Sequence, residues 1–89
     1  MPVYKISEHA LLQEVGDETV ILNLESGEYF TLDDIGTRML QLFRDEPDTH
    51  KVAVRISEEY EVNPEQAHTD LIDLLDKMVS HGLATQDET

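Results

Sequence analysis

The chain has 89 residues, which is enough for one small domain with one hydrophobic core. Its 20 Asp and Glu residues against 6 Lys and Arg give a formal net charge of −14, a sign that disfavours nucleic acid and anionic lipid as partners. Because the chain has no cysteine, disulfides and thiolate metal ligands are excluded.

The composition also bears on the location of the protein. No apolar run approaches the roughly 20 residues that a membrane-spanning helix needs. The segment from Met1 to Lys5 has no charged-then-apolar signal pattern, so we expect a cytoplasmic protein. Between Ser7 and Thr37 there is no Lys or Arg, and this acidic stretch either keeps a small protein soluble or attracts a basic polypeptide.

The first half of the chain has the pattern of a small antiparallel sheet. A mostly apolar run from Ala10 to Val15 ends at the turn signal Gly16-Asp17. Thr19 to Leu24 alternates with the period of a half-buried strand. Ser26-Gly27 predicts a two-residue hairpin turn, with residues 28–32 as the third strand.

A two-residue turn would place Leu24 opposite Tyr29 and Leu22 opposite Thr31. Apolar side chains then fall on both faces of the sheet, so each face needs a cover. We expect helices to cover one face, and either the N-terminal segment from Val3 to Ile6 or a partner to cover the other. The face opposite to that of Leu22 would carry Ile21, Phe30 and Leu32.

Two helices are predicted after the strands. Asp33 is the expected N-cap of the first, which runs to about Arg44 with Ile35, Met39, Leu42 and Phe43 as its apolar stripe. Residues 46–48 break this helix. Either Asp48 or Thr49 caps the second helix, whose inward side chains are Val52, Ala53, Ile56 and Tyr60.

A third helix starts at Pro64 with Asn63 as its cap and ends at Gly82. Its apolar arc is wider than one core contact requires. Either the helix packs between two layers of its own domain, or part of the arc lines an open groove for a partner. The segment from Leu83 to Thr85 is expected to add a short strand, and the tail to fray from about Gln86. The arc consists of Ala67, Leu71, Leu74, Leu75 and Met78, extended by Ile72 and Val79.

Catalytic and metal-binding patterns are absent from the sequence. The four histidines have no metal-ligand spacing, and the serines have no nucleophile-elbow context. Asp70, Asp73 and Asp76 recur every three residues, a pattern more typical of a solvated helix face than of convergent catalytic carboxylates. We therefore expect no enzyme, no catalytic or metal residues and no cofactor.

The second and third helices with their short link have the pattern of a helix-turn-helix, to which the terminal strand would add a wing. A DNA-reading helix presents basic and amide side chains to phosphates and base edges. The third helix instead carries Glu65, Asp70, Asp73 and Asp76, with Lys77 as its one cation. The expected fold is α+β, a three-stranded antiparallel sheet packed on three helices in one domain over residues 1–89, resembling a winged helix-turn-helix that does not bind nucleic acid.

The hairpin and first helix resemble those of the PqqD-like proteins, the precursor-peptide recognition elements of ribosomal peptide biosynthesis. The resemblance is carried by residues 20–33 and 35–43, and by the later segment 62–83 with its spaced leucines. It covers roughly residues 10–85. As a stand-alone chain the protein is most similar to the small leader-binding subunit of lasso peptide biosynthesis.

This resemblance implies a function and a site. Family members bind a leader peptide as an added strand along their third strand, in a cleft closed by the third helix. Carried over, the receiving strand is Glu28, Tyr29, Phe30, Thr31 and Leu32, and the cleft wall is Leu71, Leu74, Leu75 and Met78 with Lys77 at the rim. The third strand of a simple meander is an edge with unpaired backbone groups, which suits this role. One of Tyr29 and Phe30 is expected in the core, and the sequence leaves open which.

The implied function is non-catalytic: the protein presents its precursor to a leader peptidase and a cyclase of a lasso pathway. The alternative is a winged-helix-like regulator that acts by protein–protein association without binding DNA. The acidic face of the second helix, with Glu58, Glu59 and Glu61, is a candidate contact for partner enzymes.

Overall fold

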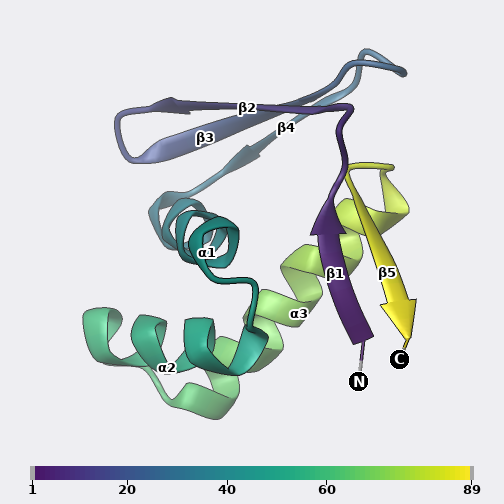
Figure 1. Ribbon diagram of the computed structural model, residues 1–89. Helices are drawn as coiled ribbons and strands as arrows, with labels where there is room; N and C mark the ends of the chain where they lie inside the picture. The colour runs from purple at the N-terminus through teal and green to yellow at the C-terminus, as the bar shows by residue number, and fades with distance from the viewer. Residues whose placement is uncertain (1, 89) are drawn as a thin grey trace.

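The fold is that of a computed structural model, which describes residues 2–88 (Figure 1). Strands occupy both ends of the described chain and helices its middle. The strands are β1 (Pro2–Ile6), β2 (Ala10–Val15), β3 (Glu18–Asn23), β4 (Tyr29–Leu32) and β5 (Ala84–Glu88), and the helices are α1 (Asp34–Asp45), α2 (Thr49–Tyr60) and α3 (Pro64–Ser80).

The main sheet is an antiparallel meander with the strand order β2-β3-β4. Gly16 and Asp17 form the first turn as predicted, since Val15 pairs with Glu18 and Gly16 adopts a φ of 63°. In Figure 1 the sheet lies at one end of the molecule with α1 beneath it and α2 farther away. The predicted class, a three-stranded antiparallel sheet packed on three helices, is confirmed.

The second hairpin differs from the prediction in its register. Leu22 pairs with Tyr29, not with Thr31, because the loop from Leu24 to Gly27 has four residues instead of two. The N–H of Asn23 donates to the carbonyl of Glu28 (2.8 Å), and the N–H of Gly27 donates to the carbonyl of Asn23 (2.8 Å). A shift of two residues leaves every side chain on its predicted face.

One face of the main sheet packs on the helices. Ile21 is fully buried there, with Phe30 and Leu32 partly buried beside it. On the same face the hydroxyl of Thr19 donates to that of Thr37 in α1 (2.8 Å), which satisfies two buried polar groups. The faces of Ile21, Phe30 and Leu32 were therefore predicted correctly.

All three helices begin at the predicted caps. The side chain of Asp33 accepts from the N–H of Gly36 (2.8 Å), that of Asp48 from the N–H groups of His50 and Lys51, and that of Asn63 from the N–H of Glu65. Each cap satisfies donors that have no partner in the first helical turn. Asp48, not Thr49, is the cap of α2.

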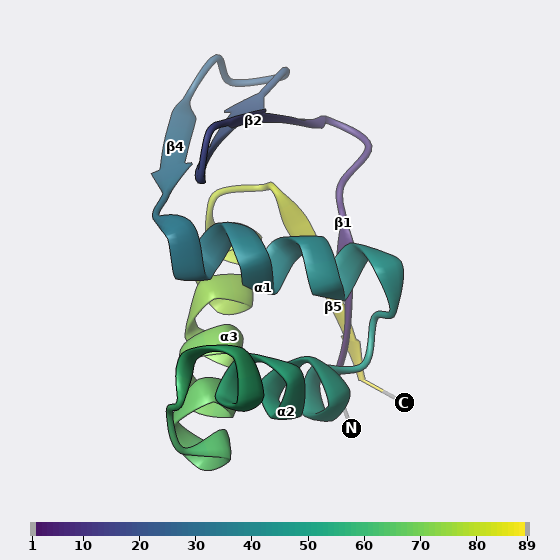
Figure 2. The ribbon, with the colours of Figure 1, turned by 90° about the vertical axis from the view of Figure 1, so that its left-hand side faces the viewer.

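The wide apolar arc of α3 serves two purposes. Ala67, Leu71 and Leu75 are at most 1% exposed and form the centre of the core with α2 and α1. Figure 2 shows α3 running behind α1 and α2, with the β1–β5 pair on its other side. Leu74, in contrast, is only partly buried, so part of the arc reaches the surface. The first interpretation therefore holds for the buried part of the arc, and the surface position of Leu74 is compatible with the second.

The two ends of the described chain pair with each other, which the sequence did not predict. β1 and β5 form a separate antiparallel sheet in which Val3 pairs with Asp87 and Tyr4 with Gln86. The segment from Val3 to Ile6 therefore does not cover the second face of the main sheet. The tail is also not frayed from Gln86, because its backbone is paired as far as Glu88.

Tyr4 connects the β1–β5 sheet to α3. Its side chain is 4% exposed, and its hydroxyl donates to Oδ1 of Asp76 (2.5 Å). Burial and the hydrogen bond to Asp76 raise the pKa of Tyr4 to about 12. Because the pKa of Tyr4 is higher in the folded than in the unfolded state, the protonated hydroxyl stabilises the folded protein. This contribution is fully present below pH 10 and is lost as the pH rises through about 12.

We expect Tyr4→Phe to lower the free energy of unfolding by about 1–3 kcal/mol, since a hydrogen bond to a charged acceptor is lost while the ring packing is kept. Urea titrations at neutral pH measure this difference. Between about pH 10 and 12 the difference should shrink, because only the wild type loses the contribution of the Tyr4 hydroxyl there. A difference that stays constant up to pH 12 would contradict the role assigned to this hydrogen bond.

Within residues 2–88, no helix is both long and apolar enough to cross a lipid bilayer.

Candidate functional site

β4 is an edge of the main sheet with unused backbone groups. The Asn23–Glu28 hydrogen bond sets the alternation of the β3–β4 ladder, so Phe30 and Leu32 direct their N–H and C=O groups toward β3. Tyr29 and Thr31 then direct theirs outward. Because no further strand of the described chain pairs with β4, these groups can bind an added strand.

A cleft of about 720 Å³ opens beside this edge. It lies between β4, the first turns of α1 and one face of α3. Figure 2 shows β4 entering α1 directly, with α3 below, so that the three elements meet along one side of the molecule. The cleft is lined by Phe30, Thr31 and Leu32 of β4, by Ile35, Gly36 and Met39 of α1, and by Asp70, Asp73, Leu74, Lys77 and Met78 of α3, together with Glu18, Ile21, Asp33, His81 and Leu83.

The floor of the cleft is apolar and mostly buried. Ile21, Met39 and Met78 are at most 4% exposed, while Leu32 and Leu74 stand higher and are partly buried. Such a floor takes apolar side chains of a ligand out of water, whereas the β4 edge binds its backbone. Side-chain selection and backbone pairing are thus available in one place.

The charges at the cleft are mostly negative. Asp70 and Asp73 stand on the α3 side and Glu18 and Asp33 on the sheet side, against the single cation Lys77. A ligand with basic side chains is therefore favoured electrostatically. Asp76, the third aspartate of the α3 row, does not line the cleft and accepts the hydrogen bond of Tyr4 instead.

Asn23 sets the distance between the sheet and the end of α3. Its Oδ1 accepts from the N–H groups of Glu25 (2.9 Å) and Ser26 (3.2 Å), which shapes the four-residue loop. Its Nδ2 donates to the carbonyl of His81 (3.0 Å), and the ring of His81 in turn contacts that of Phe30, with centroids 4.3 Å apart. Asn23 is 5% exposed, so these bonds are shielded from water.

We expect Asn23→Ala to lower the free energy of unfolding by about 2–4 kcal/mol, because three hydrogen bonds are lost at a buried position. Asn23→Asp is the matched variant: it keeps the acceptor for the loop but puts a carboxylate against the carbonyl of His81. Urea titrations of both variants separate the two contributions. A stability of Asn23→Asp equal to that of the wild type would show that the His81 bond does not hold the sheet on α3.

The structure separates the residues predicted for the site into three groups. Phe30, Thr31, Leu32, Leu74, Lys77 and Met78 line the cleft. Leu71 and Leu75 do not; both are 0% exposed and belong to the core behind the wall. Glu28 lies in the loop before β4, and Tyr29, 68% exposed, faces away from the cleft. Phe30 is thus the aromatic residue of the pair that faces the cleft.

Several lining residues were not predicted. Ile35, Gly36 and Met39 come from α1, whose stripe was assigned to the core, and His81 comes from the end of α3. A Cβ at Gly36 would lie 3.3 Å from Cβ of Leu32, so this glycine lets α1 approach β4 closely. The glycine one turn into a capped helix was the signal available in the sequence.

Among the residues that the structure describes, no three His, Asp or Glu side chains form a group that could hold a metal ion. His50 and His68 stack with ring centroids 4.6 Å apart, but they lie between the first turns of α2 and α3, away from the cleft.

Comparisons with known proteins agree with this geometry. No curated protein sequence matches the chain. A solved structure described as TbiB1 in complex with the TbiA(beta) leader peptide is 31% identical, with a TM-score of 0.83 over 90% of this chain and 93% of that one. A lasso peptide synthetase B1 complexed with the leader peptide is 26% identical, with a TM-score of 0.84 over 92% of this chain and 96% of that one. Residues 18–84 match the family model of coenzyme PQQ synthesis protein D, so the chain belongs to the PqqD family.

Proposed function

We propose that this protein binds the leader peptide of a ribosomally made precursor as an added strand on β4, and presents the precursor to the processing enzymes of a lasso peptide pathway. The observation that carries the proposal is the free edge of β4 beside an apolar cleft. The similarity to two leader-peptide complexes, over nine-tenths of the chain, supports the same conclusion.

The bound leader pairs with the outward N–H and C=O groups of Tyr29 and Thr31. Alternate leader side chains then enter the cleft over Leu32, Leu74 and Met78, where burial selects apolar residues. Basic leader residues at the rim meet Asp70 and Asp73, which speeds the encounter. Lys77 offers a contact to a leader carboxylate or backbone carbonyl.

The protein acts by position and not by catalysis. Holding the leader on β4 keeps the attached core peptide near whichever enzyme is bound to the same complex, and this raises its effective concentration at that active site. The partners in this proposal are the leader peptidase, which separates leader from core, and the cyclase, which acts on the core.

The alternative function, a regulator that acts by protein association, is not favoured. Such a regulator would bury the apolar arc of α3 against a partner, whereas in this chain Leu71 and Leu75 are buried within the protein and Leu74 lines the cleft. The alternative predicts no affinity for any leader peptide.

A fluorescence-polarisation titration tests the proposal directly. The probe is the fluorescein-labelled leader of the precursor encoded beside the gene of this protein, and the control is a scrambled peptide of the same composition. We expect saturable binding of the leader at about micromolar concentration or below, and much weaker binding of the scrambled peptide. Because both peptides carry the same charge, this difference in affinity reports recognition of the leader sequence. Equal binding of the two peptides, or none by a folded protein, would refute leader recognition.

A further inference from the structure

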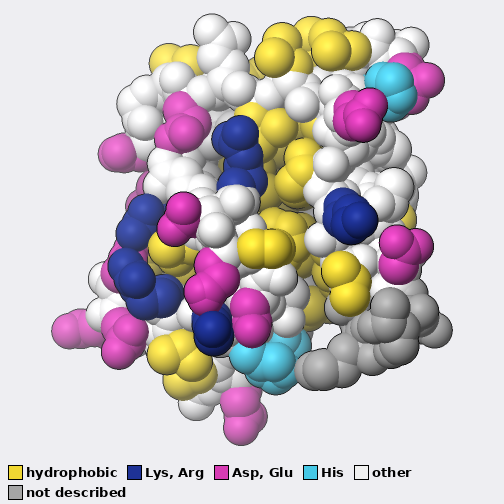
Figure 3. Space-filling model, viewed as in Figure 1, with side chains coloured by type: hydrophobic (Ala, Val, Ile, Leu, Met, Phe, Trp, Pro, Cys, Tyr) yellow, Lys and Arg dark blue, Asp and Glu magenta, His cyan; other side chains and the backbone are white. Residues whose placement is uncertain are grey.

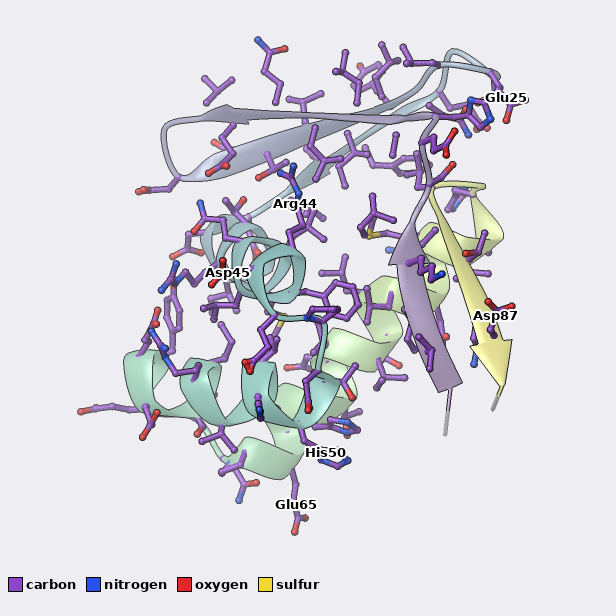
Figure 4. All side chains as sticks on the ribbon, viewed as in Figure 1. Glu25, Arg44, Asp45, His50, Glu65 and Asp87 are labelled. Carbon is purple, nitrogen blue, oxygen red and sulfur yellow. The ribbon has the colours of Figure 1, made fainter. Side chains whose placement is uncertain are left out.

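A second groove, of about 440 Å³, lies between the end of α1 and the first half of α2. Figure 4 shows Arg44 and Asp45 at the end of α1 and His50 at the start of α2, the two turns beside which it opens. It shares no lining residue with the cleft beside β4. We call it the α1–α2 groove; it is lined by Leu42, Asp45, Glu46, His50, Lys51, Val52, Val54 and Arg55.

The floor of the α1–α2 groove is apolar and reaches the surface. Val52 is 2% exposed and Leu42 is partly buried, whereas Val54 is 50% exposed. The lining positions 50, 51, 54 and 55 share one side of α2, so the groove follows this helix for more than one turn. A groove of this form suits the apolar stripe of an amphipathic helix from a partner.

The charges around the α1–α2 groove differ in sign from those of the rest of the chain. Residues 38–55 contain four Lys and Arg against three Asp and Glu, whereas the other residues contain two against 17. Figure 3 shows Lys and Arg side chains gathered over α1 and α2, next to hydrophobic ones. An acidic segment is therefore repelled by most of the protein but not by this region.

The cations of the groove are available to a partner. Arg55 lies 3.5 Å from a carboxylate oxygen of Glu59, but Arg38 already binds both oxygens of that carboxylate, at 2.8 and 3.0 Å. The Lys51 side chain pairs with Glu46 at 3.1 Å and is still 69% exposed. A partner carboxylate near Arg55 therefore displaces no strong ion pair. Because Asp45 and Glu46 form the rim on the α1 side, acidic partner residues belong on the α2 side.

A second copy of the chain does not suit this groove. The groove is not complementary to itself, so a copy would have to bind through a different face, and such contacts leave an open-ended chain instead of a closed dimer. Two copies would also bring two net charges of −14 together. The occupant is therefore a different protein.

We infer that the α1–α2 groove binds the cyclase through an amphipathic helix, whose apolar side chains cover Leu42 and Val54 and whose Asp or Glu residues face Lys51 and Arg55. This inference rests on the proposed function, which supplies the cyclase as a partner. An enzyme that acts on the core has no need to recognise the leader, so a contact away from the cleft suits it. Because groove and cleft share no residue, the leader changes the affinity for the cyclase little.

Two variants test the inference. Val54→Asp puts a carboxylate on the apolar floor, and Arg55→Glu reverses a rim charge while Glu59 keeps Arg38 as its partner. Val62→Asp is the matched control, because Val62 is also exposed but lies in the link between α2 and α3, outside groove and cleft. The probe is the cyclase encoded in the same gene cluster. Biolayer interferometry measures its affinity with and without saturating leader, and fluorescence polarisation measures leader affinity separately.

We expect Val54→Asp and Arg55→Glu each to bind the cyclase about tenfold more weakly or worse, with the control unchanged and leader affinity equal to that of the wild type in all three. Added salt should weaken binding of the cyclase to the wild type, since it screens the rim charges.

Wild-type affinity for the cyclase in both variants, or no binding of the cyclase by the wild type, would overturn the inference. Loss of leader peptidase binding in Val54→Asp with cyclase binding intact would assign the groove to the other enzyme and overturn it as well. Self-association of the wild type in sedimentation velocity that Val54→Asp abolishes would do the same in favour of a second copy. Failure of the wild type to bind leader contradicts the proposed function instead, and the polarisation arm reports that outcome by itself.

Discussion

Thr31→Pro is expected to weaken leader binding by about 1–3 kcal/mol, or roughly five- to 150-fold in affinity, in a protein that still folds. The N–H of Thr31 points outward from β4, so its loss breaks no bond within the sheet. The added strand, in contrast, loses a donor and meets the proline ring. Fluorescence polarisation with the labelled leader measures the effect.

The matched control is Thr31→Val, which keeps the backbone N–H and the β-branched shape, and which should bind leader nearly as the wild type does. Circular dichroism confirms that both variants are folded. Wild-type affinity in a folded Thr31→Pro variant would show that the leader does not pair with β4 at this position.

Leu74→Asp should weaken leader binding by about 2–4 kcal/mol, which corresponds to roughly 30-fold or more. Leu74 is partly buried in the free protein, so the new carboxylate still reaches water there, whereas a bound leader would cover it. The penalty therefore falls on the complex. It is not offset by charge, because Asp70 and Asp73 already line the same side of the cleft.

Val54→Asp changes the net charge equally at an exposed position of α2 outside the cleft, and it should leave leader affinity unchanged. If both aspartate variants weaken binding to the same extent, the cause is long-range charge and not the cleft floor. Thermal unfolding of each free variant shows whether the fold is intact.

The elements themselves could be predicted because their signals are local. Asp33, Asp48 and Asn63 satisfy donors within their own helical turns, and the period-two pattern around Ile21 reflects which strand face is buried. The β3–β4 register was wrong by two residues because the side chain of Asn23 holds a longer loop and also reaches His81, 58 positions away. No neighbour of Asn23 in the sequence reveals that second bond.

The sequence determined which faces are apolar, where the helices begin, and the strongly negative charge that disfavours nucleic acid as a partner, since these depend on composition and spacing alone. The tertiary structure decided which apolar side chains remain accessible to a ligand: Leu71 and Leu75 are buried in the core, whereas Leu74 and Met78 line the cleft. It also decided that β1 pairs with β5, so that β1 does not cover the face of the main sheet that points away from the helices. The physical reason is that exposure depends on what packs opposite a side chain, and in this fold that partner comes from segments distant in the sequence.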